Sequence, residues 1–166
     1  MNTLLKKSLL PLIVIALLGL IGWQLNHKSS APEVTFTTLH GKQISMHALQ
    51  NKVVLVNFWA TDCPGCIQEM PDLINTYHAY QAKGFEVIAV AMSYDLAEQV
   101  HNYNTTQKLP FLVTHDISGE ISQKFGGVNL TPTAFIFNKK GEMIQRTMGT
   151  LDFAKLHQLL DQELSS

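Results

Sequence analysis

The chain has 166 residues, enough for one domain of ordinary size and a short extension. Its 46% hydrophobic and 15% charged residues are typical of a globular protein and exclude a low-complexity chain. The net charge of −1 divides unevenly, because the first 31 residues hold three lysines and no acid while the rest holds nine bases and 13 acids, which argues against nucleic acid as a partner.

Residues 9–25 form the most apolar segment of the chain, and Lys6 and Lys7 precede it. This segment is as long as a short membrane-spanning helix and longer than most signal-peptide cores. No A-x-A cleavage site follows, and no cysteine follows that could carry a lipid. We therefore predict an uncleaved single-pass anchor in the bacterial inner membrane, with the remaining chain on the extracytoplasmic side, over the alternative of a cleaved signal.

The rest of the chain alternates strand and helix patterns, which predicts one layered α/β domain over residues 32–166, after an anchor and linker over residues 1–31. Phe58 and Trp59 are predicted to lie in its core. In chain order we predict a hairpin of 34–36 with 42–45, a buried central strand at 53–60, a helix that Gly84 ends, a second buried strand at 85–92, a helix at 96–108, a strand at 111–114, a short helix at 120–125, a hairpin of 134–138 with 143–148, and an amphipathic helix at 151–164.

The only two cysteines, Cys63 and Cys66, stand where the first buried strand hands over to a helix. Zinc needs four ligands, and the chain has neither four cysteines nor two histidines three to five residues apart. A c-type haem needs His after the second cysteine, where Ile67 stands. A disulfide across so small a loop stabilises little. Redox chemistry remains: the helix N-terminus favours a thiolate, with Cys63 as the exposed attacker and Cys66 as the buried resolving thiol.

The stretch NFWATDCPGCIQEMP at residues 57–71, with the triplet Thr131-Pro132-Thr133 (TPT) beginning 65 residues after Cys66, resembles the thioredoxin superfamily. Within it, the chain resembles the TlpA/ResA-like group of membrane-anchored, outward-facing thiol-disulfide oxidoreductases. The likeness covers residues 32–166 and includes the anchor. It implies a thioredoxin-like fold, with a central mixed sheet flanked by helices and an N-terminal hairpin extension, and no cofactor.

The resemblance also implies roles for single residues. Pro132 matches a cis-proline that faces the cysteines and keeps a backbone N–H away from the sulfurs, while the backbone of Thr131 pairs with a substrate strand. Pro64 and Gly65, between the cysteines, belong to the same substrate-binding surface.

Glu69 matches a glutamate that the ResA-like group carries three residues after the second cysteine. Buried, it would have a raised pKa and shuttle protons to Cys66; the alternative is a solvated carboxylate on the helix surface. Thioredoxins proper carry a proton-handling Asp at the position of Asn57, which cannot titrate.

Two departures from relatives bear on the direction of electron flow. Asp62 stands where Trp is usual, and its charge opposes a Cys63 thiolate and so favours a more reducing couple, unless salt screens it on a loop surface. Pro64-Gly65 lacks the His of strongly oxidising relatives. Both favour a disulfide reductase acting on exported proteins. Its electrons would come from a membrane-embedded or soluble thiol donor, and family analogy suggests apocytochrome c, copper-site cysteines or a repair enzyme as substrates.

Other functions stay open at this point. A thiol peroxidase shares the fold, but it needs Thr and Arg support, and the only arginine is Arg146. A copper metallochaperone could use both thiolates with His115, which stands beside Asp116, although related copper-delivery proteins space their cysteines by three. A fold used only for docking would have an unreactive Cys63.

Overall fold

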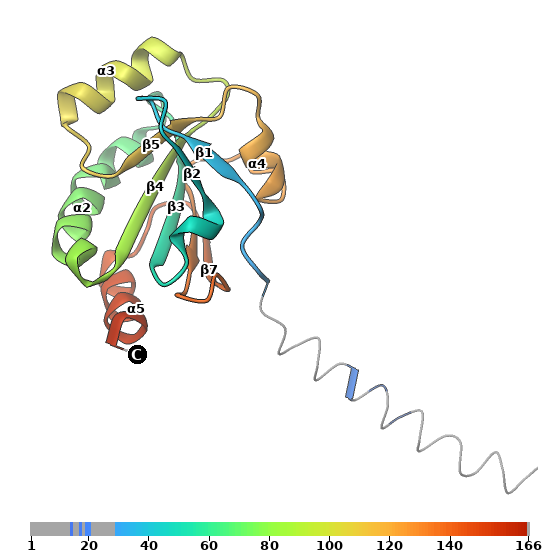
Figure 1. Cartoon of the computed structure of the whole chain (residues 1–166). Coiled ribbons are helices and arrows are strands. Elements are labelled where there is room, and N and C mark those ends of the chain that lie inside the picture. The colour runs from blue at the N-terminus through green and yellow to red at the C-terminus, as the bar shows by residue number, and fades with distance from the viewer. Residues whose placement is uncertain (1–13, 15–16, 18, 21–28, 166) are drawn as a thin grey trace, which may run out of the picture.

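The computed structural model describes residues 14, 17, 19, 20 and 29–165 (Figure 1). The predicted anchor at 9–25 therefore lies almost entirely outside the described residues and stays a prediction, as does the domain boundary after residue 31. In the part of the chain that is described, no helix is both long and apolar enough to span a membrane.

A mixed sheet forms the centre of the domain, as the resemblance to thioredoxins implies, and it has five strands in the order β5-β4-β3-β6-β7. The strands are β3 (Val53–Trp59), β4 (Phe85–Ala91), β5 (Leu112–His115), β6 (Thr133–Phe137) and β7 (Met143–Met148). β3 pairs in parallel with β4 and antiparallel with β6, and all seven of its residues are buried. Apart from Asn57 its residues are apolar, which suits this place, because helices or loops cover both faces of a central strand.

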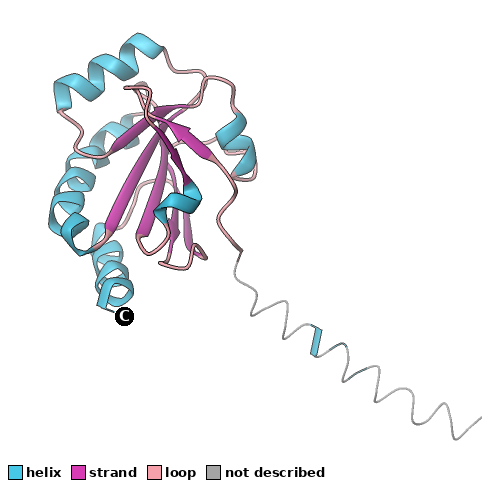
Figure 2. Ribbon diagram, viewed as in Figure 1, coloured by secondary structure: helices cyan, strands magenta, loops and turns pink. Residues whose placement is uncertain are grey.

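Helices cover both faces of the sheet (Figure 2). They are α2 (Pro64–Tyr80), α3 (Ala97–Gln107), α4 (Glu120–Lys124) and α5 (Phe153–Ser165), with short 3-10 turns η1 (Met46–Leu49) and η2 (Gln81–Lys83). The strands and helices predicted from the sequence are all present, and their ends differ by one or two residues except at the end of α2.

Two helix ends differ from the prediction for local reasons. The helix predicted from residue 151 begins at Phe153, because the Asp152 carboxylate accepts a hydrogen bond from the Lys155 amide (3.2 Å) and so caps the first turn. The helix expected to run to Gly84 ends at Tyr80; η2 follows, and Gly84 then takes a left-handed conformation at φ 101°.

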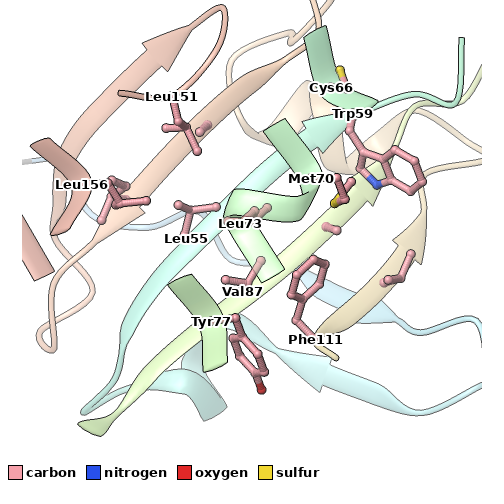
Figure 3. Packing of buried hydrophobic residues seen from close by; sticks show 14 of the residues in the cluster. Leu55, Trp59, Cys66, Met70, Leu73, Tyr77, Val87, Phe111, Leu151 and Leu156 are labelled. Carbon is pink, nitrogen blue, oxygen red and sulfur yellow. The ribbon is translucent and has the colours of Figure 1, made fainter. Parts of the chain in front are cut away.

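The sheet separates two apolar cores. One lies under α2, α3 and α5 and includes Trp59 and Cys66; the other lies under α4 and the N-terminal hairpin and includes Phe58. Phe58 and Trp59 are both fully buried, which confirms their predicted core positions. Figure 3 shows Cys66 and Met70 on α2 above the sheet, in the first of these cores.

The N-terminal hairpin, β1 (Thr35–Thr37) and β2 (Gln43–Ser45), lies against the outer edge of β5. The Leu39 amide donates to the Val113 carbonyl (3.0 Å), and the Thr114 hydroxyl donates to the Thr37 carbonyl (2.7 Å). This contact covers a strand edge that would otherwise be open to other chains.

The chain reaches this hairpin along the start of β7. Ser30 forms a β-bridge with Glu142, the Ala31 amide donates to the Gly141 carbonyl (2.8 Å), and the Met143 amide donates to the Ser29 carbonyl (2.8 Å). The entry point of the chain into the domain is thus fixed at the turn between β6 and β7.

Candidate active site

Cys63 and Cys66 form a disulfide at the point where β3 hands over to α2. Cys63 is the N-cap of α2, and its sulfur accepts a hydrogen bond from the Cys66 amide (3.2 Å). Pro64 occupies the first helical position, where its missing N–H costs nothing. Cys63 is buried but keeps 9% of its surface exposed, while Cys66 keeps none, so the cysteine at the helix N-terminus is the less buried of the two. Cys66 is buried as expected of a resolving thiol, Cys63 is less exposed than expected of the attacker, and the two roles stay predictions.

The peptide bond between Thr131 and Pro132 is cis, as the resemblance implies. A Cβ added to Gly65 would lie 3.7 Å from Pro132 Cδ and 3.3 Å from Thr150 Cγ2, so the turn between the cysteines packs directly against Pro132. Pro132 is buried and Thr131 is half-buried, with the Thr131 hydroxyl 3.2 Å from the Tyr94 hydroxyl. Residues far apart in sequence thus meet around the disulfide.

Glu69 lies one turn after Cys66 on α2 and is only 4% exposed, so the alternative of a solvated surface carboxylate is wrong. Its Oε2 accepts from the Leu151 amide (3.0 Å), and its Oε1 accepts from Asn57 Nδ2 (3.3 Å). Burial raises the pKa of Glu69 above its ordinary value, and the two hydrogen bonds oppose that rise. The site therefore holds a carboxyl group suited to taking up a proton near the sulfurs.

Asn57 is part of this site, although its side-chain amide cannot titrate. It is fully buried on β3, and its amide contacts Glu69. The sequence does contain a sign of this role, because Asn57 is the one polar residue in a strand of apolar residues. It lies on the same face of the strand as Leu55 and Trp59, which both lie in the core under α2. A polar side chain at such a position needs a buried partner.

Asp95 is a second residue near the site that the sequence did not indicate. Its carboxylate is 7% exposed and accepts from both the amide (2.7 Å) and the hydroxyl (2.6 Å) of Thr61. These bonds tie the loop before Cys63 to the loop after β4. Asp62, next to Cys63, is exposed, as expected of a loop-surface residue.

The residues considered for other functions lie away from this arrangement. The Arg146 guanidinium stacks over the Phe135 ring (5.1 Å to the centroid), and Phe135 belongs to the core on the opposite side of the sheet from Cys66. His115 is half-buried at the end of β5. Among the described residues, no group of three or more His, Cys, Asp or Glu side chains is arranged to hold a metal ion.

Glu69→Gln is expected to stabilise the oxidised protein at alkaline pH and not at acidic pH. Because the folded pKa lies above the ordinary value of 4.5, the wild type loses stability as the pH rises from about that value through the folded pKa. Each unit of difference is worth about 1.4 kcal/mol. Urea unfolding from pH 4 to pH 9 measures the effect. A constant difference between the two proteins over this range would contradict it.

Comparisons with known proteins give consistent results. The Redoxin family profile matches residues 26–160. The chain is 33% identical over 168 residues to thiol-disulfide oxidoreductase ResA of Bacillus thuringiensis subsp. konkukian, covering 96% of this chain and 95% of that protein. It is 30% identical to sporulation thiol-disulfide oxidoreductase A of Bacillus subtilis, covering 92% and 96%.

Among solved structures, a putative thioredoxin from Neisseria meningitidis superimposes with a TM-score of 0.77 at 40% identity, covering 84% of this chain and 93% of that one. A thiol:disulfide interchange protein of the thioredoxin family from Chlorobium tepidum superimposes with a TM-score of 0.76 at 27% identity, covering 83% and 97%.

Proposed function

The chain belongs to the Redoxin family as a ResA-like thiol-disulfide oxidoreductase, and from that premise we propose that it is a reductase of disulfides in exported proteins. The observation that carries the proposal is the site itself: a disulfide whose less buried cysteine is a helix N-cap, a fully buried second cysteine, and a buried carboxyl group one turn further along α2. The Cys63–Cys66 pair would cycle between dithiol and disulfide.

The reaction transfers two electrons to the substrate. The Cys63 thiolate attacks one sulfur of the substrate disulfide, a mixed disulfide forms, and the other substrate sulfur leaves as a thiolate that takes up a proton. Cys66 then loses its proton to Glu69 and attacks Cys63 Sγ. The enzyme disulfide forms, and the second substrate sulfur leaves as a thiolate. A thiol donor restores the dithiol.

The surface around the disulfide would bind the substrate as an extended strand. Thr131 would offer its backbone for strand pairing, and Pro132, which has no N–H, keeps a competing donor away from the sulfurs. Pro64 is exposed and Gly65 half-buried, so the turn between the cysteines is open to an approaching chain.

We place the enzyme on the extracytoplasmic side of the inner membrane, held by residues 9–25, because disulfides persist there unless something reduces them. Its electrons would come from a membrane-embedded or soluble thiol donor. Family analogy suggests apocytochrome c, copper-site cysteines or a repair enzyme as its substrates.

The reduction potential of the full-length protein tests the direction of the reaction. After equilibration with glutathione buffers, we expect a value near the thioredoxin potential of about −270 mV. A value near about −120 mV, which is typical of a strong oxidase, would contradict the proposal.

Asp62→Asn tests whether the exposed charge beside Cys63 contributes to a reducing potential. Removing the charge should favour the Cys63 thiolate and raise the potential slightly, on the order of 10 mV at low salt. Direct equilibration of the two proteins measures the difference. If the wild type and Asp62→Asn have the same potential at both low and high salt, solvent screens the charge completely and Asp62 does not contribute.

A further inference from the structure

Asn57, Glu69 and Leu151 form a buried hydrogen-bonded group with one unusual feature. Asn57 Nδ2 donates to Glu69 Oε1 (3.3 Å), and the Leu151 amide donates to Glu69 Oε2 (3.0 Å). Asn57 Oδ1, at the other end of the same amide, is buried and has no hydrogen-bond partner among the described residues. Buried acceptors without a donor are uncommon, because they lose their hydration and gain nothing in return.

The donors and acceptors around Glu69 restrict where a proton can sit. A backbone N–H can only donate, so Leu151 requires Oε2 to accept in every protonation state of Glu69. An ionised Glu69 accepts at both oxygens, which matches the orientation of the Asn57 amide in the structure. A protonated Glu69 carries its hydrogen on Oε1 and needs an acceptor there, which the amide NH2 group cannot provide.

Rotation of the Asn57 amide by half a turn resolves this conflict, because it brings Oδ1 to the place of Nδ2. Since Oδ1 has no partner to lose, the only hydrogen bond that the rotation breaks is the one to Glu69. One end of the amide is without a partner in either orientation. The protonation state of Glu69 alone therefore decides which orientation is favoured.

We propose that Asn57 is the positioning residue of Glu69, with a side-chain amide that turns over each time Glu69 gains or loses its proton. This rests on the proposed function, in which the proton on Cys66 Sγ passes to Glu69 Oε1, leaving a thiolate and a neutral acid, and later returns. An Asp at position 57 would add a second negative charge, and a Leu would leave Oε1 without a partner. The amide serves both states.

Few other titratable groups lie where they could change the response of the Asn57 amide to pH. On α2 the cysteines titrate only when reduced, and on β3 Asn57 itself does not titrate. Before α5, Asp152 is exposed and pairs with Lys155 (3.0 Å). Burial raises the Glu69 pKa, hydrogen bonds from Leu151 and Asn57 lower it, and no charged side chain of the described residues is among the causes. In the oxidised protein, a change at Asn57 near the Glu69 midpoint therefore reports on Glu69.

NMR of the oxidised full-length protein tests the proposal directly. The Asn57 side-chain amide signals and the Glu69 carboxyl carbon signal should shift with one common midpoint as the pH is varied. In Glu69→Gln the side chain imitates the protonated acid: its oxygen accepts from Leu151 and its NH2 group donates to Asn57 Oδ1. The Asn57 signals of this variant should lose their pH dependence and stay near the acidic position of the wild type. Constant Asn57 signals in the wild type, while Glu69 titrates, would overturn the proposal.

Kinetics of disulfide exchange supply a second readout. Asn57→Leu should slow exchange by about tenfold, the worth of one hydrogen bond to a charged group, and shift the midpoint of its pH profile. The matched control is Thr114→Val, which removes a partly buried hydrogen bond to Thr37 on β1, away from Glu69, and should leave the midpoint unchanged. An unchanged midpoint in Asn57→Leu would count against the proposal.

The NMR titration and the exchange kinetics together distinguish a failure of this proposal from a failure of the proposed function. If the protein fails to reduce disulfides, the NMR titration still decides whether Asn57 follows Glu69. If reduction depends on Glu69 but the Asn57 signals do not move, only the positioning role is overturned.

Discussion

Cys63→Ser is expected to lower the rate of disulfide exchange by at least about 10³-fold, because the hydroxyl that replaces the sulfur is not ionised near neutral pH and cannot form a disulfide. Cys63 is the cysteine that keeps some surface exposure, and it stands at the helix N-cap. Reduction of a model disulfide by full-length protein, coupled to a thiol donor, measures the loss. Turnover at a tenth of the wild-type rate or more would assign the attack to another group.

Cys66→Ser is the matched variant, since it also removes the enzyme disulfide but retains Cys63. It should attack substrate and then stop, because no second thiol is available to resolve the mixed disulfide. Mass spectrometry under non-reducing conditions should show the covalent adduct with Cys66→Ser and none with Cys63→Ser. Equal adducts from both variants would contradict the assignment of the two roles.

Phe58→Ala is expected to lower the free energy of unfolding by about 3–5 kcal/mol, the usual effect of removing a buried aromatic ring. Phe58 is fully buried and packs edge-on against Phe125 (centroids 5.2 Å apart) and Phe135 (5.9 Å). The melting temperature should fall by roughly 10 °C, as measured by thermal unfolding of the oxidised protein.

Leu130→Ala is the control for this substitution, because Leu130 is 63% exposed and should change stability by no more than about 0.5 kcal/mol. Phe58 faces the core opposite the disulfide, so the reduction potential of Phe58→Ala should stay at the wild-type value while the protein is folded. A loss of stability below about 1 kcal/mol would mean that this core rearranges to fill the space.

The fold could be predicted because its signals are local. Apart from Asn57, the run Val53–Trp59 is apolar on both faces, which marks a strand covered on both sides, and Cys63 follows it after a loop of three residues. The cis form of the peptide bond before Pro132 followed from family resemblance alone, since only about 5–6% of such bonds are cis in folded proteins.

The surroundings of Glu69 could not be predicted from the sequence alone. Its hydrogen-bond partners are Asn57, 12 positions before it, and Leu151, 82 positions after it, and only the packing of α2 on the sheet brings the three together. The pairing of Asp95 with Thr61 also depends on two loops that meet across parallel strands. Spacing along one helix indicated that Glu69 shares a face with Cys66, but not what that face meets.

The bridge between Ser30 and Glu142 determines at which end of the sheet the chain enters the domain. It fixes the entry of the chain at the turn that follows β6, while the disulfide lies beyond the opposite end of β3, about 20 Å away for a strand of seven residues. The point where the chain enters and the redox site therefore lie at opposite ends of the sheet. A segment before Ser29, whatever holds it, joins the domain at the end away from the disulfide. Substrate and thiol donor must both approach the end of the domain that lies away from this entry point.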